Sequence, residues 1–252
     1  MKLKLILAKD LLDLAIHEVY ALLEVSNTDY DVIEIRNNEM IIKVNSIPKE
    51  LCRACLVKEI YINDKLFMKF NRGILMKSKF RNDISPHYAP LEALISRLLI
   101  NLARVREGSL VLDPFSGVGG ILMEAKMVGA EVVGIDLSLD CLKVLRKNIP
   151  SSDIVLSDTV MICIKDNSID AIVTDPPYGR LSITEQRLEK LYENFSEIAY
   201  KVLKKNHYLA ISQPCYVHSI DYFLSAGFEL VCIGLQRKHG ALTRAIMVFR
   251  KT

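Results

Sequence analysis

Long apolar runs and targeting segments are missing from this 252-residue chain. No stretch reaches the roughly 18 consecutive apolar residues that a membrane-spanning helix needs. The apolar part of the N-terminus is too short for a signal peptide. The six cysteines are scattered, which is typical of proteins kept in a reducing cytosol. We therefore expect a cytoplasmic protein with no membrane partner.

Paired metal ligands are scarce as well. Cys52 and Cys55 form the one close cysteine pair, and neither a second pair nor paired histidines accompany it. A zinc or redox site needs such partners. The leucine, alanine and valine residues around the two cysteines instead favour packing in a hydrophobic core. We therefore predict no metal site.

A strong excess of one charge is also lacking, because the net charge is only +3. The distribution says more than the total. Residues 65–82 carry six cations and three phenylalanines but no acid. Such a mixture is typical of a nucleic-acid contact, in which cations bind phosphates and rings stack on bases. A solvated linker explains the same pattern equally well, so both interpretations stay open.

The periodicity of apolar residues divides the chain into three parts. Residues 1–64 alternate strand and helix signals in the order strand, helix, two strands, helix, strand, which is that of a ferredoxin-like α+β unit. A basic linker is expected at 65–84. Residues 85–252 then hold seven strand signals separated mostly by helical spacing, and the last two strands are expected to pair antiparallel. This alternation predicts an α/β, Rossmann-like domain with a mostly parallel, seven-stranded sheet covered on both faces.

The segment 171–180 is the most informative part of the sequence. Its apolar strand signal ends in Asp175, Pro176, Pro177 and Tyr178, and the prolines forbid continuation in the middle of a sheet. These groups are therefore expected at the carboxyl end of a buried strand, where open α/β sheets bind ligands. An exocyclic amine on a flat base needs acceptors for its two hydrogens and a ring to stack on. We predict that these residues form the catalytic site for transfer to such an amine, because an ordinary turn leaves the combination unexplained.

A glycine-rich segment joins an earlier strand signal to its helix and contains Asp113, Phe115, Gly117, Gly119 and Gly120. Glycines permit a sharp turn and a close approach of the backbone to a ligand. The carboxylate would repel the pyrophosphate of a dinucleotide but attract the sulfonium and α-ammonium groups of S-adenosylmethionine. We therefore predict that this segment binds S-adenosylmethionine, and that it is more than a tight strand–helix turn.

Two further acids follow strand signals. Asp136 lies 19 residues after Gly117, where an acid is expected to accept hydrogen bonds from both ribose hydroxyls. The alternative role for Asp136 is to cap the helix that follows, for which Ser138 also qualifies. Asp158 follows the third strand signal of the α/β region, and we predict that it accepts a hydrogen bond from the adenine amine.

With these motifs, residues 85–252 resemble the class I S-adenosylmethionine-dependent amino-methyltransferases, and in particular the archaeal tRNA guanosine-10 N2-methyltransferases. The likeness rests on 102–105 leading into 111–120, on 175–180 with 191–192, and on 236–244. Residues 1–64 look like the ferredoxin-like element that opens those enzymes. The resemblance implies methyl transfer to the exocyclic N2 of a guanine in tRNA, with the base flipped from its helix and stacked on Tyr178.

Members of that family usually carry a THUMP domain, which holds tRNA, between these two regions. The basic segment here is too short for one. RNA recognition is then expected from a smaller surface or from a partner protein. We predict phosphate contacts by basic residues of the linker and of the last part of the chain, namely Lys69, Arg72, Lys77, Lys79, Arg237, Lys238 and Arg244.

Two rival functions stay open. A DNA amino-methyltransferase acting on adenine N6 or cytosine N4 uses the same Asp-Pro-Pro-Tyr chemistry, although no separate DNA-recognition region is apparent. A catalytically idle RNA-binding subunit on the same fold is the other rival. The intact Gly117, Asp136 and Asp175 argue against that second alternative.

Overall fold

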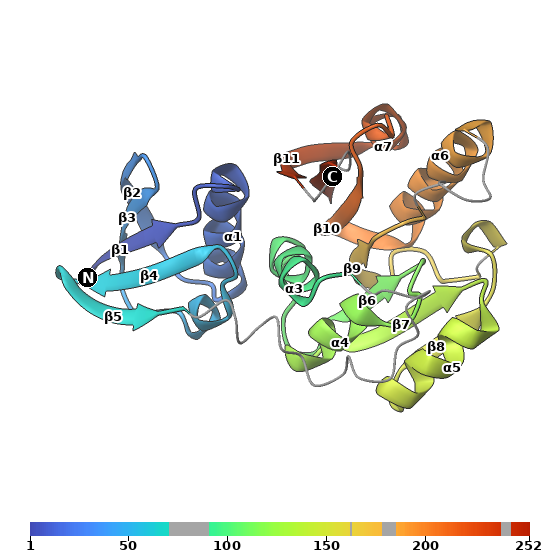
Figure 1. Ribbon diagram of the computed structural model, residues 1–252, viewed down its shortest axis with the longest axis horizontal. Helices are drawn as coiled ribbons and strands as arrows, with labels where there is room; N and C mark the ends of the chain where they lie inside the picture. The colour runs from blue at the N-terminus through green and yellow to red at the C-terminus, as the bar shows by residue number, and fades with distance from the viewer. Residues whose placement is uncertain (71–90, 162, 178–184, 238–242) are drawn as a thin grey trace.

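A small N-terminal unit lies beside a larger α/β domain (Figure 1). The computed structural model describes residues 1–70, 91–161, 163–177, 185–237 and 243–252. Across these ranges, no helix is both long and apolar enough to cross a bilayer.

The N-terminal unit is an antiparallel sheet in the order β2-β3-β1-β4-β5 with helix α1 (Leu12–Val25) packed on it. The order of its first four strands is that of the expected ferredoxin-like unit, with β1 between β3 and β4. The strands are β1 (Lys2–Leu7), β2 (Tyr30–Arg36), β3 (Glu39–Val44), β4 (Val57–Ile62) and β5 (Lys65–Lys69).

Two local predictions for this unit were wrong. The second helix expected in residues 1–64 is only a short 3-10 turn, η1 (Lys49–Arg53), because the chain enters β4 soon afterwards. The expected linker does not begin at residue 65, because β5 pairs with β4 and forms a fifth strand. Asn63 and Asp64 make the tight turn between them with φ of 47° and 64°, as a two-residue hairpin of the primed type requires.

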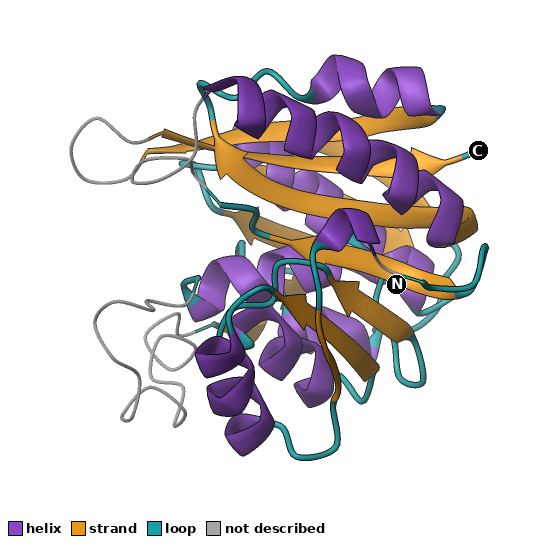
Figure 2. Ribbon diagram, turned by 90° about the vertical axis from the view of Figure 1, so that its right-hand side faces the viewer, coloured by secondary structure: helices purple, strands orange, loops and turns teal. Residues whose placement is uncertain are grey.

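The α/β domain is built on a seven-stranded sheet in the order β11-β12-β10-β9-β6-β7-β8, with helices on both faces (Figure 2). Its five neighbouring strands from β10 to β8 are parallel, and β11 and β12 close the other side antiparallel. This confirms the predicted fold class. The strands are β6 (Leu110–Asp113), β7 (Glu131–Asp136), β8 (Asp153–Leu156), β9 (Ile169–Thr174), β10 (Leu203–Pro214), β11 (Phe228–Arg237) and β12 (Thr243–Lys251).

The helices of this domain follow the predicted periodicity closely. A single 3-10 turn, η4 (Thr159–Met161), follows β8. The α-helices are α3 (Ala93–Leu102), α4 (Gly120–Met127), α5 (Leu139–Asn148), α6 (Glu185–Val202) and α7 (Ile220–Ala226).

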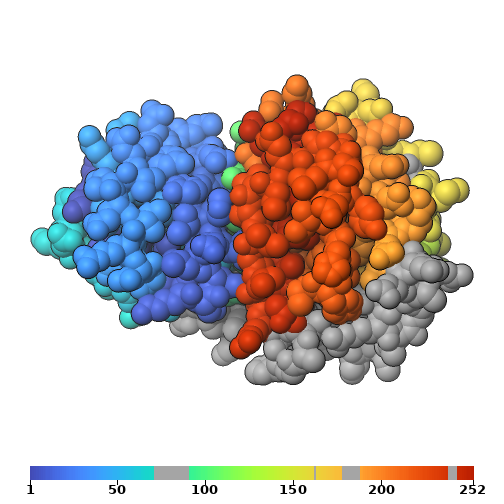
Figure 3. Space-filling view, turned by 90° about the horizontal axis from the view of Figure 1, so that it is seen from above, coloured from blue at the N-terminus to red at the C-terminus, as the bar shows by residue number. Residues whose placement is uncertain are grey.

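The two parts share one hydrophobic core. A continuous cluster of buried side chains contains Leu5 of β1, Leu14 of α1, Leu98 of α3 and Val111 of β6. Helix α3 has all but one of its ten residues buried, because α1 covers one side of it and α4 another. Figure 3 shows the N-terminal unit in direct contact with the last strands of the domain, and α1 packs on β11 there.

A buried polar group crosses the same junction. The Glu18 carboxylate of α1 accepts hydrogen bonds from the backbone N–H groups of Cys55 (2.7 Å) and Leu56 (2.8 Å) and from Asn101 Nδ2 of α3 (2.7 Å). Burial raises the pKa of Glu18, and these donors oppose that rise. Cys55 lies in the core as predicted, whereas Cys52 is exposed.

Candidate active site

Three carboxylates meet at the carboxyl ends of neighbouring strands. Asp113 ends β6, Asp136 ends β7, and Asp175 follows the last residue of β9. The strand order β9-β6-β7 places these ends side by side. From β6 the chain builds outward to both sides of the sheet, and such a switch point is where open α/β sheets bind ligands.

Two cavities open beside these strand ends. The smaller, about 160 Å³, is lined by the glycine-rich segment with Asp113, Cys141 and Asp175. The larger, about 460 Å³, is lined by Asp136, Asp158 and apolar side chains, and it also includes Asp175. Phe115 and Asp175 border both cavities, so one elongated ligand can reach from the glycine segment to Asp158 along them.

Asp113 is almost completely buried, at 1% exposure. Its Oδ1 accepts hydrogen bonds from Thr174 Oγ1 (2.7 Å) and from the backbone N–H of Phe115 (3.2 Å). Burial raises the pKa of Asp113 to about 7, against the effect of these donors and with a smaller contribution from the nearby Asp175 and Asp136. A cationic ligand group in the smaller cavity would favour the ionised form of Asp113.

The glycine segment has the geometry that only glycine adopts easily. Gly117 has φ of 49°, and its N–H donates a 2.8 Å hydrogen bond to Asp136 Oδ2. Gly119, with φ of 89°, precedes α4, and a Cβ there would stand 3.0 Å from Leu145 Cγ. The segment therefore depends on glycine for its backbone path.

Asp136 supports this segment and is not the helix cap. Its Oδ1 accepts from the N–H of Ser138 (2.8 Å), while its other oxygen holds Gly117. The cap of α5 is Ser138, whose hydroxyl accepts from the N–H of Cys141 (3.3 Å). The carboxylate of Asp136 also lines the larger cavity, where the ribose role was predicted.

The far end of the larger cavity combines one acid with apolar groups. Asp158 accepts from the N–H of Val160 (3.1 Å), which shapes the turn η4. Thr159 donates a 2.6 Å hydrogen bond to the carbonyl of Pro114 and so ties this turn to the glycine segment. Leu137 lines the cavity although its side chain is 72% exposed. The sequence analysis missed Leu137 and Thr159, and the one available signal was their position next to Asp136 and Asp158.

The segment that was predicted to be catalytic follows the carboxyl end of β9. Asp175 is half-buried, Pro176 is buried, and Pro177 is exposed and lines the larger cavity. Tyr178 lies outside the described residues, so its stacking role stays a prediction.

The residues predicted to contact phosphates differ in their surroundings. Arg72, Lys77, Lys79 and Lys238 lie outside the described residues. Lys69 is exposed, and its ammonium pairs with Glu59 on β4 at 3.0 Å. Arg237 is exposed at the end of β11.

Arg244 does not fit the predicted set. It is only 4% exposed on β12, and its Nη1 donates to Gln236 Oε1 (3.2 Å) on the neighbouring strand. A phosphate contact needs an exposed guanidinium, so we correct this prediction and assign Arg244 to the sheet.

The fold and the site together define the class of protein. The sheet is parallel except for the antiparallel strands β11 and β12 at one side. A glycine turn follows β6, and acids follow the neighbouring strands. This arrangement is suited to binding S-adenosylmethionine. Asp113 suits its cationic methionine end, and Asp136, Asp158 and Leu137 suit its adenosine. The chain is therefore a class I methyltransferase, and S-adenosylmethionine is its cofactor.

Comparison with known proteins identifies the family. A profile of the UPF0020 family, described as the RMKL-like methyltransferase domain, matches residues 81–221, and the chain belongs to this family. The tRNA (guanine(10)-N2)-dimethyltransferase of Methanothermobacter thermautotrophicus is 31% identical over 78% of this chain and 61% of that protein. Its counterpart from Methanocaldococcus jannaschii is 28% identical over 87% of this chain and 62% of that protein. The chain thus spans about three fifths of these curated relatives.

A solved structure supports the fold. TrmN from Thermus thermophilus aligns over 100% of both chains with a TM-score of 0.57 and 16% identity, which shows a shared architecture. The expected lack of a THUMP domain stays a prediction.

Proposed function

We propose that this methyltransferase acts on the exocyclic N2 of a guanine in tRNA. The observation that carries the proposal is the Asp175-Pro176-Pro177 segment at the carboxyl end of β9, beside the cavity that suits the cofactor. The names of the two archaeal relatives support tRNA guanine as the substrate. The cytoplasm is the proposed site of action, in keeping with a tRNA substrate.

The residues of the chain divide the work between the two substrates. Asp113 and the glycine segment hold the methionine end of the cofactor, Asp136 holds its ribose and Asp158 its adenine. When bound, S-adenosylmethionine supplies an electrophilic methyl group.

The Asp175 carboxylate and the Pro176 carbonyl accept the two hydrogens of the guanine amine. The lone pair of such an amine is otherwise conjugated with its ring. The two acceptors therefore orient the nitrogen so that its lone pair points at the methyl carbon of the cofactor. Alignment of this kind supplies much of the rate of a displacement reaction. The methylated amine is acidic enough to lose its surplus proton to water, so Asp175 acts by holding and orienting the amine. The base must be flipped from its helix to reach this position.

Nucleoside analysis tests this function. The purified chain is incubated with methyl-labelled S-adenosylmethionine and, in separate reactions, with unmodified tRNA transcripts and with duplex and single-stranded DNA. We expect N2-methylated guanosine from tRNA, and at least about a hundredfold less of it from Asp175→Ala, which lacks the side-chain acceptor. Labelled N6-methyladenine or N4-methylcytosine from DNA would instead support the DNA alternative.

A partner requirement is tested in the same assay. Addition of a cell extract depleted of small molecules would raise the activity strongly if RNA recognition comes from another protein. A rate no higher than the sum of the rates of the chain alone and the extract alone contradicts the alternative that a partner protein supplies RNA recognition.

A further inference from the structure

Thr174 is the last residue of β9 and directly precedes Asp175, yet nothing in the mechanism above uses it. Its side chain is fully buried, and its hydroxyl donates a 2.7 Å hydrogen bond to Asp113 Oδ1. Strands β9 and β6 are neighbours in the sheet. The hydroxyl therefore links the strand that carries the catalytic segment to the acid that opens the glycine segment.

The surroundings of Asp113 favour its neutral form. Two charged groups face it from neighbouring elements, Asp175 after β9 and Asp136 at the end of β7, and both are acids. Cys141 of α5 lines the same cavity, and burial raises the pKa of its thiol, which keeps it uncharged. Among the described residues, the two contacts that favour ionised Asp113 are the backbone N–H of Phe115 at 3.2 Å and the shorter bond from Thr174.

We propose that Thr174 is a positioning residue that keeps Asp113 ionised and directed at the α-ammonium group of the cofactor. The inference rests on the assignment of Asp113 to the methionine end of S-adenosylmethionine in the proposed function. In this proposal, the charge of Asp113 depends on a hydroxyl group of β9, the strand that also presents Asp175. Removal of the hydroxyl leaves Asp113 buried beside two acids with one weak donor, so the carboxyl group takes up a proton at neutral pH.

The size of the effect follows from the hydrogen bond. With the hydroxyl present, the pKa of Asp113 is about 7. A hydrogen bond to a charged group shifts a pKa by about one to two units. If the ionised acid is the form that binds the cofactor, loss of this bond weakens binding roughly 5- to 50-fold at pH 7 and less than about twofold at pH 9.

Calorimetric titration with S-adenosylhomocysteine between pH 6 and pH 9 tests the proposal. This product keeps the α-ammonium group, which titrates identically in all variants and so cancels in their ratios. Thr174→Val and Thr174→Ala should bind more weakly than the parent at low pH and converge with it at high pH. Thr174→Ser, which keeps the hydroxyl, should follow the parent profile. The matched control is Ser212→Ala on β10, because this buried hydroxyl has no hydrogen-bond partner among the described residues.

The outcomes separate a positioning role from a structural one. A loss of affinity that is the same at every pH, or that Ser212→Ala shares, overturns the proposal. If Thr174→Val does not fold, the comparison of serine with alanine at position 174 decides, since these variants differ only in the hydroxyl. In the Asp113→Asn background the pH-dependent difference between threonine and alanine at position 174 should vanish, so adding Thr174→Ala should weaken binding no further. Failure of the parent to bind S-adenosylhomocysteine at all would contradict the cofactor assignment itself, while a failure on tRNA leaves these binding results untouched.

Discussion

Asp175 differs from the other acids of the site because it borders both cavities. In the proposed function its carboxylate meets the guanine amine beside the cofactor. Asp175→Ala should lower the rate of methyl transfer to tRNA by about a hundredfold or more, as expected for loss of a transition-state contact. The affinity for S-adenosylhomocysteine should stay within a few-fold. Single-turnover kinetics and calorimetry measure the two effects, and retention of more than about a tenth of the parent rate would exclude the catalytic role.

In the proposed function Asp136 serves the cofactor in two ways, by accepting from the ribose and by holding the N–H of Gly117. Asp136→Ala should weaken S-adenosylmethionine binding by about 10- to 100-fold, which corresponds to roughly 1.5–3 kcal/mol. Isothermal titration measures the dissociation constant. The control is Ser138→Ala, which removes the cap of α5 and should leave the affinity close to that of the parent. Equal losses in both variants would mean that the position matters only for local folding.

Asp113 also makes stability depend on pH. Its pKa rises from 3.8 to about 7 on folding, chiefly through burial. The folded state therefore keeps its proton over a pH range in which the unfolded state has lost it. The stability that this group contributes is full below pH 4 and is lost as the pH rises through about 7.

The comparison that isolates this effect is with Asp113→Asn. The free energy of unfolding of the parent minus that of the variant should fall by about 2–4 kcal/mol between pH 4 and pH 8. Urea unfolding followed by circular dichroism at several pH values measures it. A difference that is constant with pH would show that Asp113 ionises normally in the folded protein.

At the scale of elements, the ends of the strands could be predicted from the sequence better than their surroundings. Asp113, Asp136 and Asp175 follow apolar strand signals, and parallel strands bring such positions to one edge, so the site could be placed without a structure. The burial of Arg244 and the bond from Thr174 to Asp113 could not, because both depend on which strands become neighbours. The fifth strand, β5, was not predicted, because its mixture of cations and apolar residues resembles a linker.

The junction between α1 and α3 gives a prediction about elements. Glu18→Gln places an amide donor among three N–H donors in a fully buried position, and it should lower the free energy of unfolding by about 2–4 kcal/mol. Glu24→Gln on the same helix is the matched control. Its ion pair with Arg104 lies near the surface, so a loss below about 1 kcal/mol is expected. Denaturant unfolding measures both, and similar losses would mean that the buried bonds contribute little.

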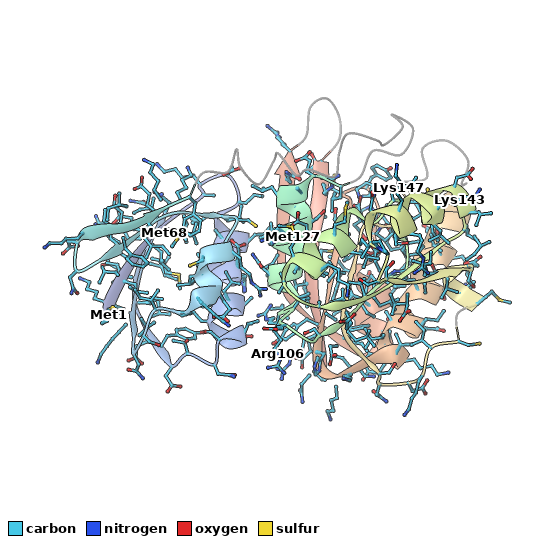
Figure 4. All side chains as sticks on the ribbon, turned by 90° about the horizontal axis from the view of Figure 1, so that it is seen from below. Met1, Met68, Arg106, Met127, Lys143 and Lys147 are labelled. Carbon is cyan, nitrogen blue, oxygen red and sulfur yellow. The ribbon has the colours of Figure 1, made fainter. Side chains whose placement is uncertain are left out.

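At the scale of the whole molecule, the proposed binding of tRNA depends on where the cations lie. In Figure 4, Met68 of β5 lies in the N-terminal unit on the left and Lys143 of α5 on the right of the α/β domain, with Arg106 between them. Lys69 already has an acidic partner in Glu59, so the segment that follows β5 becomes the stronger candidate.

The salt dependence of tRNA binding tests that candidate. Replacing Arg72, Lys77 and Lys79 with alanine should weaken binding and flatten the slope of log affinity against log salt by about 0.7–0.9 per lost phosphate contact. Lys126 and Lys204 serve as controls, because both lie near the amino ends of the strands, at the edge opposite the site. An unchanged slope in the triple variant would mean that the basic segment is only a linker.

The core shared by α1, α3 and the large sheet has a consequence for how the two parts of the chain evolve. The region that matches the family starts at residue 81. Side chains of α1 and β1, which precede it, belong to the same buried cluster as side chains of α3 and the large sheet, which lie within it. A gene fragment that begins at residue 81 would encode a protein with an exposed apolar surface that is prone to aggregation. Replacement of the N-terminal unit of this chain by an unrelated one would therefore leave part of the apolar surface of its α/β domain uncovered. The interior of the N-terminal unit and that of the α/β domain must change together over evolutionary time.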